Sequence, residues 1–299
     1  MDQVEQVKRK VDVVEVVGDY VALKKAGRNY KGLCPFHSEK TPSFMVNPEL
    51  QIYKCFGCGK GGDVISFIEE MEGVEFVEAL EMLADRAGVK LKPMGDGEDR
   101  SEQKRMIEAH ELAKEYYHYL LTEHKRGKEA LKYLNDRGVG EKLIEEFKLG
   151  YALESWEGLY KYLVNKKNFE PELLVRAGLL VKSSKGRGYY DRFRGRVMFP
   201  LIDHRGRNLA FGGRIMPGLG DGKTPKYINS PETDIYHKSE MLYGFYQAKQ
   251  GIRKNDRAVV VEGEMDMISS YGAGVTETVA IKGTALTTQQ VRLIKRLTK

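Results

Sequence analysis

Two short motifs, Cys34-Pro35-Phe36-His37 and Cys55-Phe56-Gly57-Cys58, decide the fold of the first part of this chain. Each motif offers two sulfur or nitrogen ligands, and seventeen residues separate the motifs. Four such ligands in two tight turns are typical of a structural tetrahedral zinc site, which leaves no coordination position open for a catalytic water. All 3 cysteines of the chain lie in these motifs, and an odd count argues for a metal site rather than disulfides. We therefore predict one structural Zn²⁺ per chain, bound by Cys34, His37, Cys55 and Cys58.

Short strands and helices are expected around these motifs. Valines at spacings of three and four predict one amphipathic helix over residues 1–19. Glycines in and after the second motif (Gly57, Gly59, Gly61 and Gly62) are expected to adopt positive φ angles. Asp63 is a candidate N-cap for a helix over residues 64–71, and Gly88 is suited to end a helix over residues 75–87. Strand-like pieces occur at residues 20–23, 44–47 and 51–53.

The charge is distributed unevenly along the chain. Residues 20–62 carry seven Lys or Arg against two acids, and residues 178–257 carry sixteen against seven. Aromatic residues are interspersed among the cations of residues 20–62, an arrangement typical of surfaces on which the bases of single-stranded nucleic acid stack. These aromatic residues are Tyr30, Phe36, Phe44, Tyr53 and Phe56. A domain this small needs most of these rings for its core, so we expect one or two of them to bind. The second block is equally compatible with a polyanion-binding surface and with an ordinary solvated one.

The residues around the two motifs carry a family resemblance. Residues 34–44, followed by residues 53–63, closely resemble the CHC2-type zinc module of bacterial replicative primases. The resemblance implies that this module engages single-stranded DNA and helps to choose the template start site. A polar, glycine-rich stretch at residues 93–99 marks the end of this first domain.

The middle of the chain predicts a helical segment followed by a basic one. The helices are expected at residues 101–124, 128–136, 141–147, 157–166 and 171–177, and strands at about residue 189, 197–202 and 208–213. If residues 191–200 are extended, Arg192, Arg194 and Arg196 project from one face as a phosphate-binding ladder. These residues resemble the basic core of the primase RNA polymerase domain. The resemblance implies contacts to nucleotide and nucleic acid by Arg194, Arg196, Arg214, Lys226, Tyr227, Asn229 and Lys238.

The last part of the chain predicts a β-α-β-α alternation with a parallel sheet, over residues 258–261, 265–271, 278–281 and 288–297. Glu262 directly follows the first strand, where open α/β sheets bind ligands, although a strand-end acid can also simply cap the next helix. The segment resembles the toprim fold, and this implies that Glu262 is catalytic and binds Mg²⁺ or Mn²⁺. Lys282-Gly283-Thr284 matches a glycine-threonine turn of that family, whereas Glu264 stands where the family usually has an aromatic residue. The paired aspartates of the family's next strand are not among the 299 residues.

The fold class we predict is α+β multidomain. It comprises a zinc-binding domain (1–95), the N-terminal basic part of an RNA polymerase domain (100–256) and an incomplete, Rossmann-like toprim domain (257–299). The resemblance implies a nucleotidyltransferase, a DNA primase that makes short RNA primers on single-stranded DNA. This chain is then expected to be a fragment of it, inactive by itself. A topoisomerase, a recombination mediator and a non-catalytic single-stranded DNA-binding module are the alternatives.

The expected partners follow from the resemblance as well. They are a single-stranded DNA template, ribonucleoside triphosphates, a replicative helicase and single-stranded DNA-binding protein, with the helicase-binding domain of the family absent. The sequence has no apolar run near the roughly 20 residues that span a bilayer and no apolar stretch typical of a signal peptide. We therefore expect a cytoplasmic monomer with no membrane association.

Overall fold

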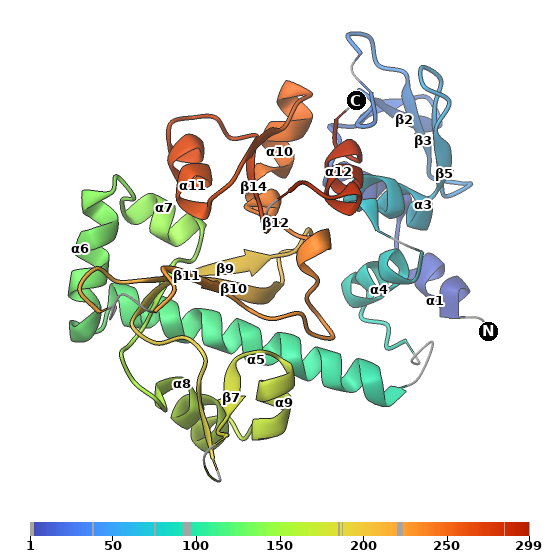
Figure 1. Ribbon diagram of the computed structural model, residues 1–299. Coiled ribbons are helices and arrows are strands. Elements are labelled where there is room, and N and C mark those ends of the chain that lie inside the picture. The colour runs from blue at the N-terminus through green and yellow to red at the C-terminus, as the bar shows by residue number, and fades with distance from the viewer. Residues whose placement is uncertain are drawn as a thin grey trace. The chain divides into compact units, whose positions relative to one another are not determined.

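The computed structural model describes residues 3–37, 39–74, 76–91, 97–184, 186, 188–219, 224–283 and 285–298. The chain divides into two compact units, Met1–Gly95 and Asp96–Lys299, which are drawn together in Figure 1 and described separately below. Most of the expected boundary stretch, 93–96, lies outside the described residues, as does Thr284 of the expected glycine-threonine turn.

The first unit contains a five-stranded antiparallel sheet in the order β1-β2-β3-β4-β5. The strand expected at residues 20–23 is wrong. The backbone N–H groups of Tyr20 and Val21 both donate to the carbonyl of Val17, so these residues finish a helix instead. The strands are β1 (Lys24–Ala26), β2 (Asn29–Gly32), β3 (Phe44–Asn47), β4 (Ile52–Cys55) and β5 (Gly61–Asp63).

The prediction of a single N-terminal helix is also wrong, because the chain forms two helices there, α1 (Gln3–Lys10) and α2 (Val13–Gly18). Asp12 separates them as the N-cap of α2, where its carboxylate accepts from the N–H groups of Val14 and Glu15. Asp63 caps α3 (Val64–Ile68) as predicted, and a π-helical turn, Glu69–Gly73, continues that helix. Helix α4 (Phe76–Ala87) ends before Gly88, whose φ of 62° is the expected left-handed conformation.

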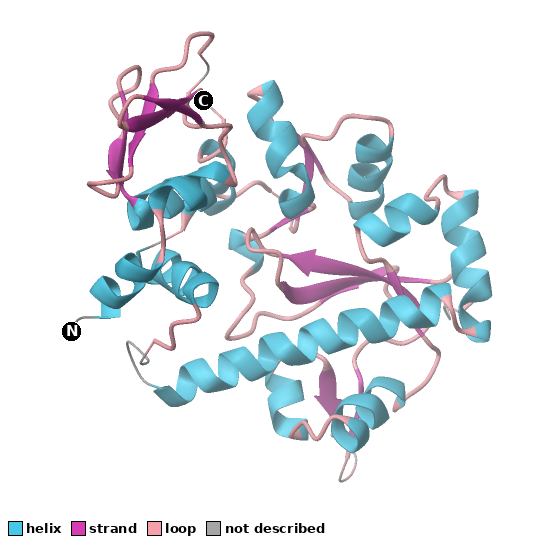
Figure 2. Cartoon of the chain, turned by 180° about the vertical axis from the view of Figure 1, so that it is seen from behind, coloured by secondary structure: helices cyan, strands magenta, loops and turns pink. Residues whose placement is uncertain are grey.

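The second unit is built on a four-stranded antiparallel sheet in the order β11-β10-β9-β6. Its strands are β6 (Gly150–Ala152), β9 (Arg196–Ile202), β10 (Asn208–Ile215) and β11 (Tyr227–Asn229). The long helix α5 (Gly97–Thr122) runs along this sheet, as Figures 1 and 2 show from opposite sides. Gly150 permits the close packing, because a Cβ there would lie 2.6 Å from the Cβ of Tyr117.

Shorter elements surround this sheet. The helices match the expected positions: α6 (Lys128–Asp136), α7 (Glu141–Glu146), α8 (Gly158–Tyr160) with the π-helical turn Lys161–Lys166, and α9 (Pro171–Arg176). Strands β7 (Leu180–Lys182) and β8 (Tyr189–Asp191) form a separate antiparallel pair. The sequence did not predict β6 or β7, since strands of three residues carry almost no periodic signal.

The C-terminal part has the predicted β-α-β-α order. It consists of β13 (Val259–Val261), α11 (Glu264–Gly272), β14 (Thr278–Ile281) and α12 (Thr288–Lys295), and β13 and β14 are parallel as expected. Strand β12 (Leu242–Tyr243) pairs antiparallel with β14, and α10 (Phe245–Asn255) packs on β14; neither was predicted. Within the described ranges, no helix combines the length and the apolar character needed to cross a membrane.

Candidate functional site

The four predicted zinc ligands come together in the first unit. The ligand atoms of Cys34, His37, Cys55 and Cys58 all lie within 4.8 Å of one another. The Sγ atoms of Cys34 and Cys58 are 3.8 Å apart, and 3.9 Å separates the Cys55 Sγ from the His37 Nδ1. A tetrahedral zinc ion with bonds of about 2.0–2.3 Å needs ligand separations of about 3.3–3.8 Å. The donor set therefore suits one zinc ion, and the four ligand atoms are already gathered close to the separations that such an ion needs.

Backbone geometry shapes both motifs. The N–H of Phe36 donates to the Cys34 sulfur at 3.4 Å, and that of Cys58 donates to the Cys55 sulfur at 3.5 Å. The expectation of positive φ at four glycines is wrong for three of them, because Gly59 alone among the four has a positive φ, of 80°. Gly57 is required for a steric reason and not for its φ angle. A Cβ there would lie 2.7 Å from the His37 Nε2, so only glycine permits this approach.

Glu39 is a site residue that the sequence analysis missed. Its Oε1 accepts from the N–H groups of Cys34, at 2.8 Å, and Ser43, at 3.0 Å, while its Oε2 lies 3.4 Å from the His37 Nε2. The hydrogen bond from the Ser43 hydroxyl is the main cause that lowers the pKa of this carboxyl. A carboxylate behind a ligating histidine fixes the ring and its tautomer. The acid two residues after His37 was the available signal, but spacing alone does not show that its oxygens turn back toward the motif.

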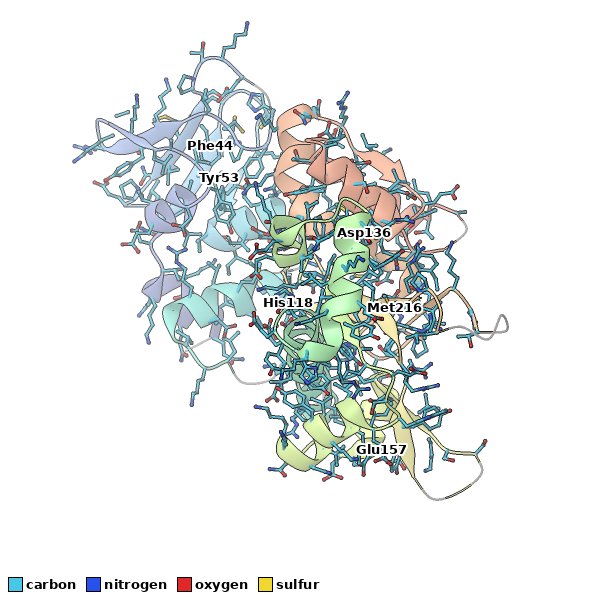
Figure 3. The ribbon with its side chains drawn as sticks, turned by 90° about the vertical axis from the view of Figure 1, so that its left-hand side faces the viewer. Phe44, Tyr53, His118, Asp136, Glu157 and Met216 are labelled. Carbon is cyan, nitrogen blue, oxygen red and sulfur yellow. The ribbon has the colours of Figure 1, made fainter. Side chains whose placement is uncertain are left out.

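The aromatic side chains of the first unit divide into core and surface. Phe44 and Tyr53, labelled in Figure 3, are fully buried and stack on each other with ring centroids 5.4 Å apart. Phe36 packs against both of them. Phe56 differs from these rings, because 75% of it is exposed at the second zinc motif. It is the ring best placed to stack on an unpaired base.

The arginine ladder expected in the second unit is wrong. Residues 192–195 are not a strand, and Gly195 with a φ of 60° turns the chain before β9 begins at Arg196. The guanidinium of Arg194 instead lies over the rings of Trp156, at 4.1 Å, and Tyr190, at 5.3 Å. Trp156 is 63% exposed, so this cation–aromatic group lies at the surface.

Arg196 lies inside the protein and is only 4% exposed. Its guanidinium donates to the carbonyls of Gly213 at 3.1 Å, Pro225 at 2.9 Å and Lys226 at 3.3 Å. Burial lowers the pKa of this guanidinium. These contacts join β10 to the start of β11, so Arg196 supports the segment that carries Lys226.

Four of the other predicted binding residues lie on or beside two neighbouring strands of the same sheet, β10 and its edge strand β11. Arg214 and Tyr227 are paired across β10 and β11, and the arginine donates to the tyrosine hydroxyl at 2.6 Å. Asn229 pairs with Gly212 on the same two strands, and Lys226 is exposed just before β11. The structure thus groups these residues around β11. Lys238 lies in a separate turn, Lys238–Glu240, where its N–H donates to Glu232 at 3.0 Å.

The predicted catalytic residue lies at the carboxyl end of the parallel strands. Glu262 follows β13 directly and is exposed, and Gly263 is the N-cap of α11. Asp266, in the first turn of α11, is exposed as well. Exposed carboxylates offer the oxygen ligands that Mg²⁺ prefers, although the described residues form a group of three or more potential ligands only at the zinc motifs.

The other two acids of this segment are occupied. Glu264 is buried and forms an ion pair with Lys282, which follows β14. Glu277, which precedes β14, is 2% exposed and accepts from Arg257 at 2.9 Å and from Asn255 at 2.8 Å. Glu264 is therefore paired inside the protein, whereas Glu262 and Asp266 face solvent.

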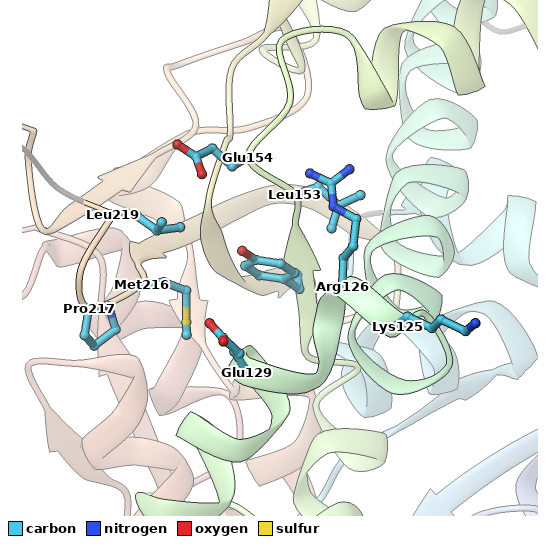
Figure 4. Close-up of a pocket in the computed structure, with 9 residues that line it drawn as sticks. Lys125, Arg126, Glu129, Leu153, Glu154, Met216, Pro217 and Leu219 are labelled. Carbon is cyan, nitrogen blue, oxygen red and sulfur yellow. The ribbon is translucent and has the colours of Figure 1, made fainter.

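A pocket of about 330 Å³ lies elsewhere in the second unit, beside α6 and β6 (Figure 4). None of the predicted site residues lines it. Its walls mix charged and apolar side chains, from Lys125, Arg126, Glu129, Tyr151, Leu153, Glu154, Met216, Pro217 and Leu219.

Three family models match successive segments of the chain. Residues 1–99 match the CHC2 zinc finger family, residues 116–249 match the N-terminal domain of the DNA primase catalytic core, and residues 259–299 match a Toprim-like family. The DNA primase of Geobacillus stearothermophilus is 46% identical over 98% of this chain. The match covers 49% of that relative, so the chain spans about half the length of the curated relatives it matches.

Two solved structures extend this comparison. The zinc-binding and RNA polymerase domains of the Aquifex aeolicus primase are 37% identical, with a TM-score of 0.60 over 100% of this chain and 71% of that one. A DnaG primase catalytic domain bound to single-stranded DNA is 36% identical, with a TM-score of 0.59 over 67% of this chain and 60% of that one.

Proposed function

The chain belongs to the family of bacterial DnaG-type DNA primases, and we propose that it contributes to the synthesis of short RNA primers on single-stranded DNA. The observation that carries this proposal is the exposed Glu262 at the carboxyl end of β13, beside the parallel strand β14. That edge is where α/β sheets bind their ligands. A catalytic Mg²⁺ or Mn²⁺ held there would neutralise the triphosphate and favour ionisation of the attacking 3′-hydroxyl.

The chain's own residues have distinct proposed roles. Glu262, with Asp266 beside it, would hold the divalent ion. Lys226, Tyr227 and Asn229 around β11 would contact the nucleotide or the template, with Arg214 orienting the Tyr227 hydroxyl through the 2.6 Å hydrogen bond. Arg196 is assigned a supporting role, because its donors are taken up by backbone carbonyls.

The first unit is proposed to bind one structural zinc ion and to contact unpaired template bases. Cys34, His37, Cys55 and Cys58 would be the ligands, with Glu39 orienting His37. The exposed Phe56 supports base stacking at this unit. Ribonucleoside triphosphates, a replicative helicase and single-stranded DNA-binding protein remain proposed partners. We also propose a cytoplasmic monomer, because a compartment that keeps thiols reduced suits the clustered cysteines.

The two exposed carboxylates, of Glu262 and Asp266, would bind a divalent ion weakly, because Mg²⁺ keeps most of its waters without further anionic ligands. We therefore expect little primer synthesis by these 299 residues alone. The test is template-dependent ribonucleotide incorporation by this chain alone and by a chimera that adds the part of the Geobacillus stearothermophilus primase that follows the matched segment. The chimera should make primers, and Glu262→Gln in the chimera should slow synthesis at least about 100-fold, a loss on the scale of a major electrostatic contribution.

The matched control is Glu277→Gln, which removes a carboxylate from the other end of β14. It should leave the rate per folded molecule near that of the unmodified chimera. If Glu262→Gln has no larger effect than Glu277→Gln, the catalytic placement is wrong. A folded chimera that binds DNA but incorporates no nucleotide would favour the alternative of a non-catalytic DNA-binding module.

A further inference from the structure

Glu264 and Lys282 form a buried ion pair immediately beside the proposed metal-binding edge. The Lys282 Nζ contacts the Glu264 Oε1, and the two side chains are only 3% and 10% exposed. Removing two charges from water is costly, and a pair of well-packed apolar side chains often replaces such an ion pair without loss of stability. The location of these charges therefore calls for an explanation other than stability.

The Glu264–Lys282 pair is covered by the four-stranded sheet of the second unit. A Cβ placed on Gly212 of β10 would lie 2.7 Å from the Glu264 Oε1, 3.2 Å from the Lys282 Nζ and 3.3 Å from the Asn229 Oδ1. Any side chain at position 212 would collide with the pair. The backbone of β10 thus closes over Glu264 and Lys282 and limits their access to solvent, which strengthens their electrostatic influence on nearby groups.

The pair lies close to Glu262 because of the strand register. Val261 of β13 is paired with Ala280 of β14, so Glu262 and Lys282 both leave the sheet at the same edge. Neighbouring strands are about 4.8 Å apart and each residue advances about 3.3 Å, so the Cα atoms of Glu262 and Lys282 are about 6 Å apart. With the reach of the two side chains added, the Lys282 charge lies on the order of 10 Å from a cation held by Glu262. An unbalanced ammonium at that distance would repel a divalent cation.

We propose that Glu264 is the counter-ion that shields the metal-binding edge at Glu262 from the Lys282 charge. Together, Glu264 and Lys282 set the affinity of that edge for a divalent cation without touching it. This inference rests on the proposed function, because it takes Glu262 as the cation ligand. Its signature is a pair of opposite effects: loss of the Glu264 charge weakens cation binding, and loss of the Lys282 charge strengthens it.

The test measures Mn²⁺ binding to the zinc-loaded chain by the electron paramagnetic resonance signal of free Mn²⁺, at pH 7.5 and low ionic strength. Glu264→Gln should weaken Mn²⁺ binding about five- to fifteen-fold, the Coulomb effect of one unit charge on a divalent ion about 10 Å away at an effective dielectric constant of about 40–80. Lys282→Gln should strengthen binding by a similar factor. The double variant Glu264→Gln/Lys282→Gln should return to the affinity of the unmodified chain.

Glu277→Gln is the matched control for loss of a buried charge. Glu277 pairs with Arg257 at the opposite end of β14, about 17 Å from Lys282 at about 3.3 Å per residue. This variant should lower the thermal unfolding midpoint and weaken Mn²⁺ binding no more than about two- to four-fold, because the Coulomb effect falls with distance. A purely structural role for the Glu264–Lys282 pair predicts instead that both single variants weaken Mn²⁺ binding alike, in step with their loss of stability. That result, or unchanged affinity in both, would overturn the inference.

Glu262→Gln separates this inference from the proposed function. If it abolishes the Mn²⁺ site while the Glu264 and Lys282 variants bind as the unmodified chain does, only the shielding role fails. If Mn²⁺ affinity survives Glu262→Gln, the proposed metal placement fails, and the shielding role fails with it.

Discussion

His110, on the face of α5 that packs against the sheet, is a titratable side chain that is fully removed from water. It is 0% exposed, its ring stacks on Phe211 with centroids 5.6 Å apart, and its Nε2 donates to the Ala177 carbonyl at 2.9 Å. The Nδ1 has no hydrogen-bond partner within the described part of the chain. Burial lowers the pKa of His110 to about 4. Protonation would place a charge where no acceptor faces it.

This burial predicts acid sensitivity of the second unit. The folded pKa lies below the ordinary value of about 6.5, so the stabilisation is complete above that pH and is lost as the pH falls toward about 4. Between pH 7 and pH 5 the loss attributable to His110 is about 2 kcal/mol. Urea unfolding at pH 7 and at pH 5 measures this loss of stability. The signal is the fluorescence of Trp156, the single tryptophan in the sequence.

The comparison variant is His110→Gln, which keeps a side-chain donor but does not titrate. It should lower stability at pH 7 and lose less of its remaining stability than the unmodified chain on going to pH 5. Equal pH dependence in the two proteins would mean that another group causes the acid sensitivity.

At the scale of elements, the residues around β10 and β11 divide into proposed binding residues and a supporting one. Arg196 is held by three backbone carbonyls, whereas Lys226 is exposed one residue before β11. Arg194 lies at the surface with Trp156. Substituting Arg196 removes hydrogen bonds from a charged donor, each worth about 1.5–3 kcal/mol, so this change tests stability rather than DNA binding.

We predict that Arg194→Ala/Lys226→Ala weakens binding of single-stranded DNA and lowers its salt dependence. Each lost phosphate contact reduces the slope of log affinity against log salt concentration by about 0.7 for single strands. Binding of a labelled oligonucleotide at several salt concentrations gives the slope. Lys104→Ala on α5 removes an exposed lysine at another element and is the control. An unchanged slope in the folded double variant would mean that the basic block is an ordinary solvated surface.

At the scale of the whole molecule, each of the two units has its own hydrophobic core. One core packs the helices and strands of the first unit around Phe44, Ile65 and Leu80. The second unit is organised around the sheet and α5, with Phe199 and Phe211 buried at its centre. A structural zinc ion contributes about 10–16 kcal/mol of apparent binding free energy, much of which is folding energy in a small domain.

Removal of zinc should therefore unfold the first unit and leave the second one folded. Hydrogen exchange in the presence of a chelator should show loss of protection up to about residue 91 and unchanged protection in α5, β9 and β10. Trp156 belongs to the second unit, so its fluorescence should stay constant. Metal analysis should give one zinc per chain, reduced in Cys55→Ala. Full zinc content in that variant would contradict the ligand assignment.

Much of the local structure could be predicted from the sequence, because its causes lie within a few residues. The ligand spacing of the two zinc motifs, the Asp63 cap and the Gly88 helix end all act over a single turn. The alternation from β13 to α12 was predicted for the same reason, and it located Glu262 at a strand end. Asp12, which divides the N-terminal helix, carried a local signal that the valine periodicity obscured.

Tertiary structure alone decided which charged residues face solvent. Arg196 and Glu264 have the same chemistry in the sequence as Arg194 and Glu262, yet the first two are buried against partners 17 to 30 residues away. Two further contacts also depend on the path of the backbone: the hydrogen bond of Glu39 to the Cys34 N–H and the close approach of Gly212 to Lys282. Neither can be predicted from residue spacing. A spacing pattern specifies which groups are available, whereas the free energy of burial, which sets their roles, depends on contacts between distant segments of the chain.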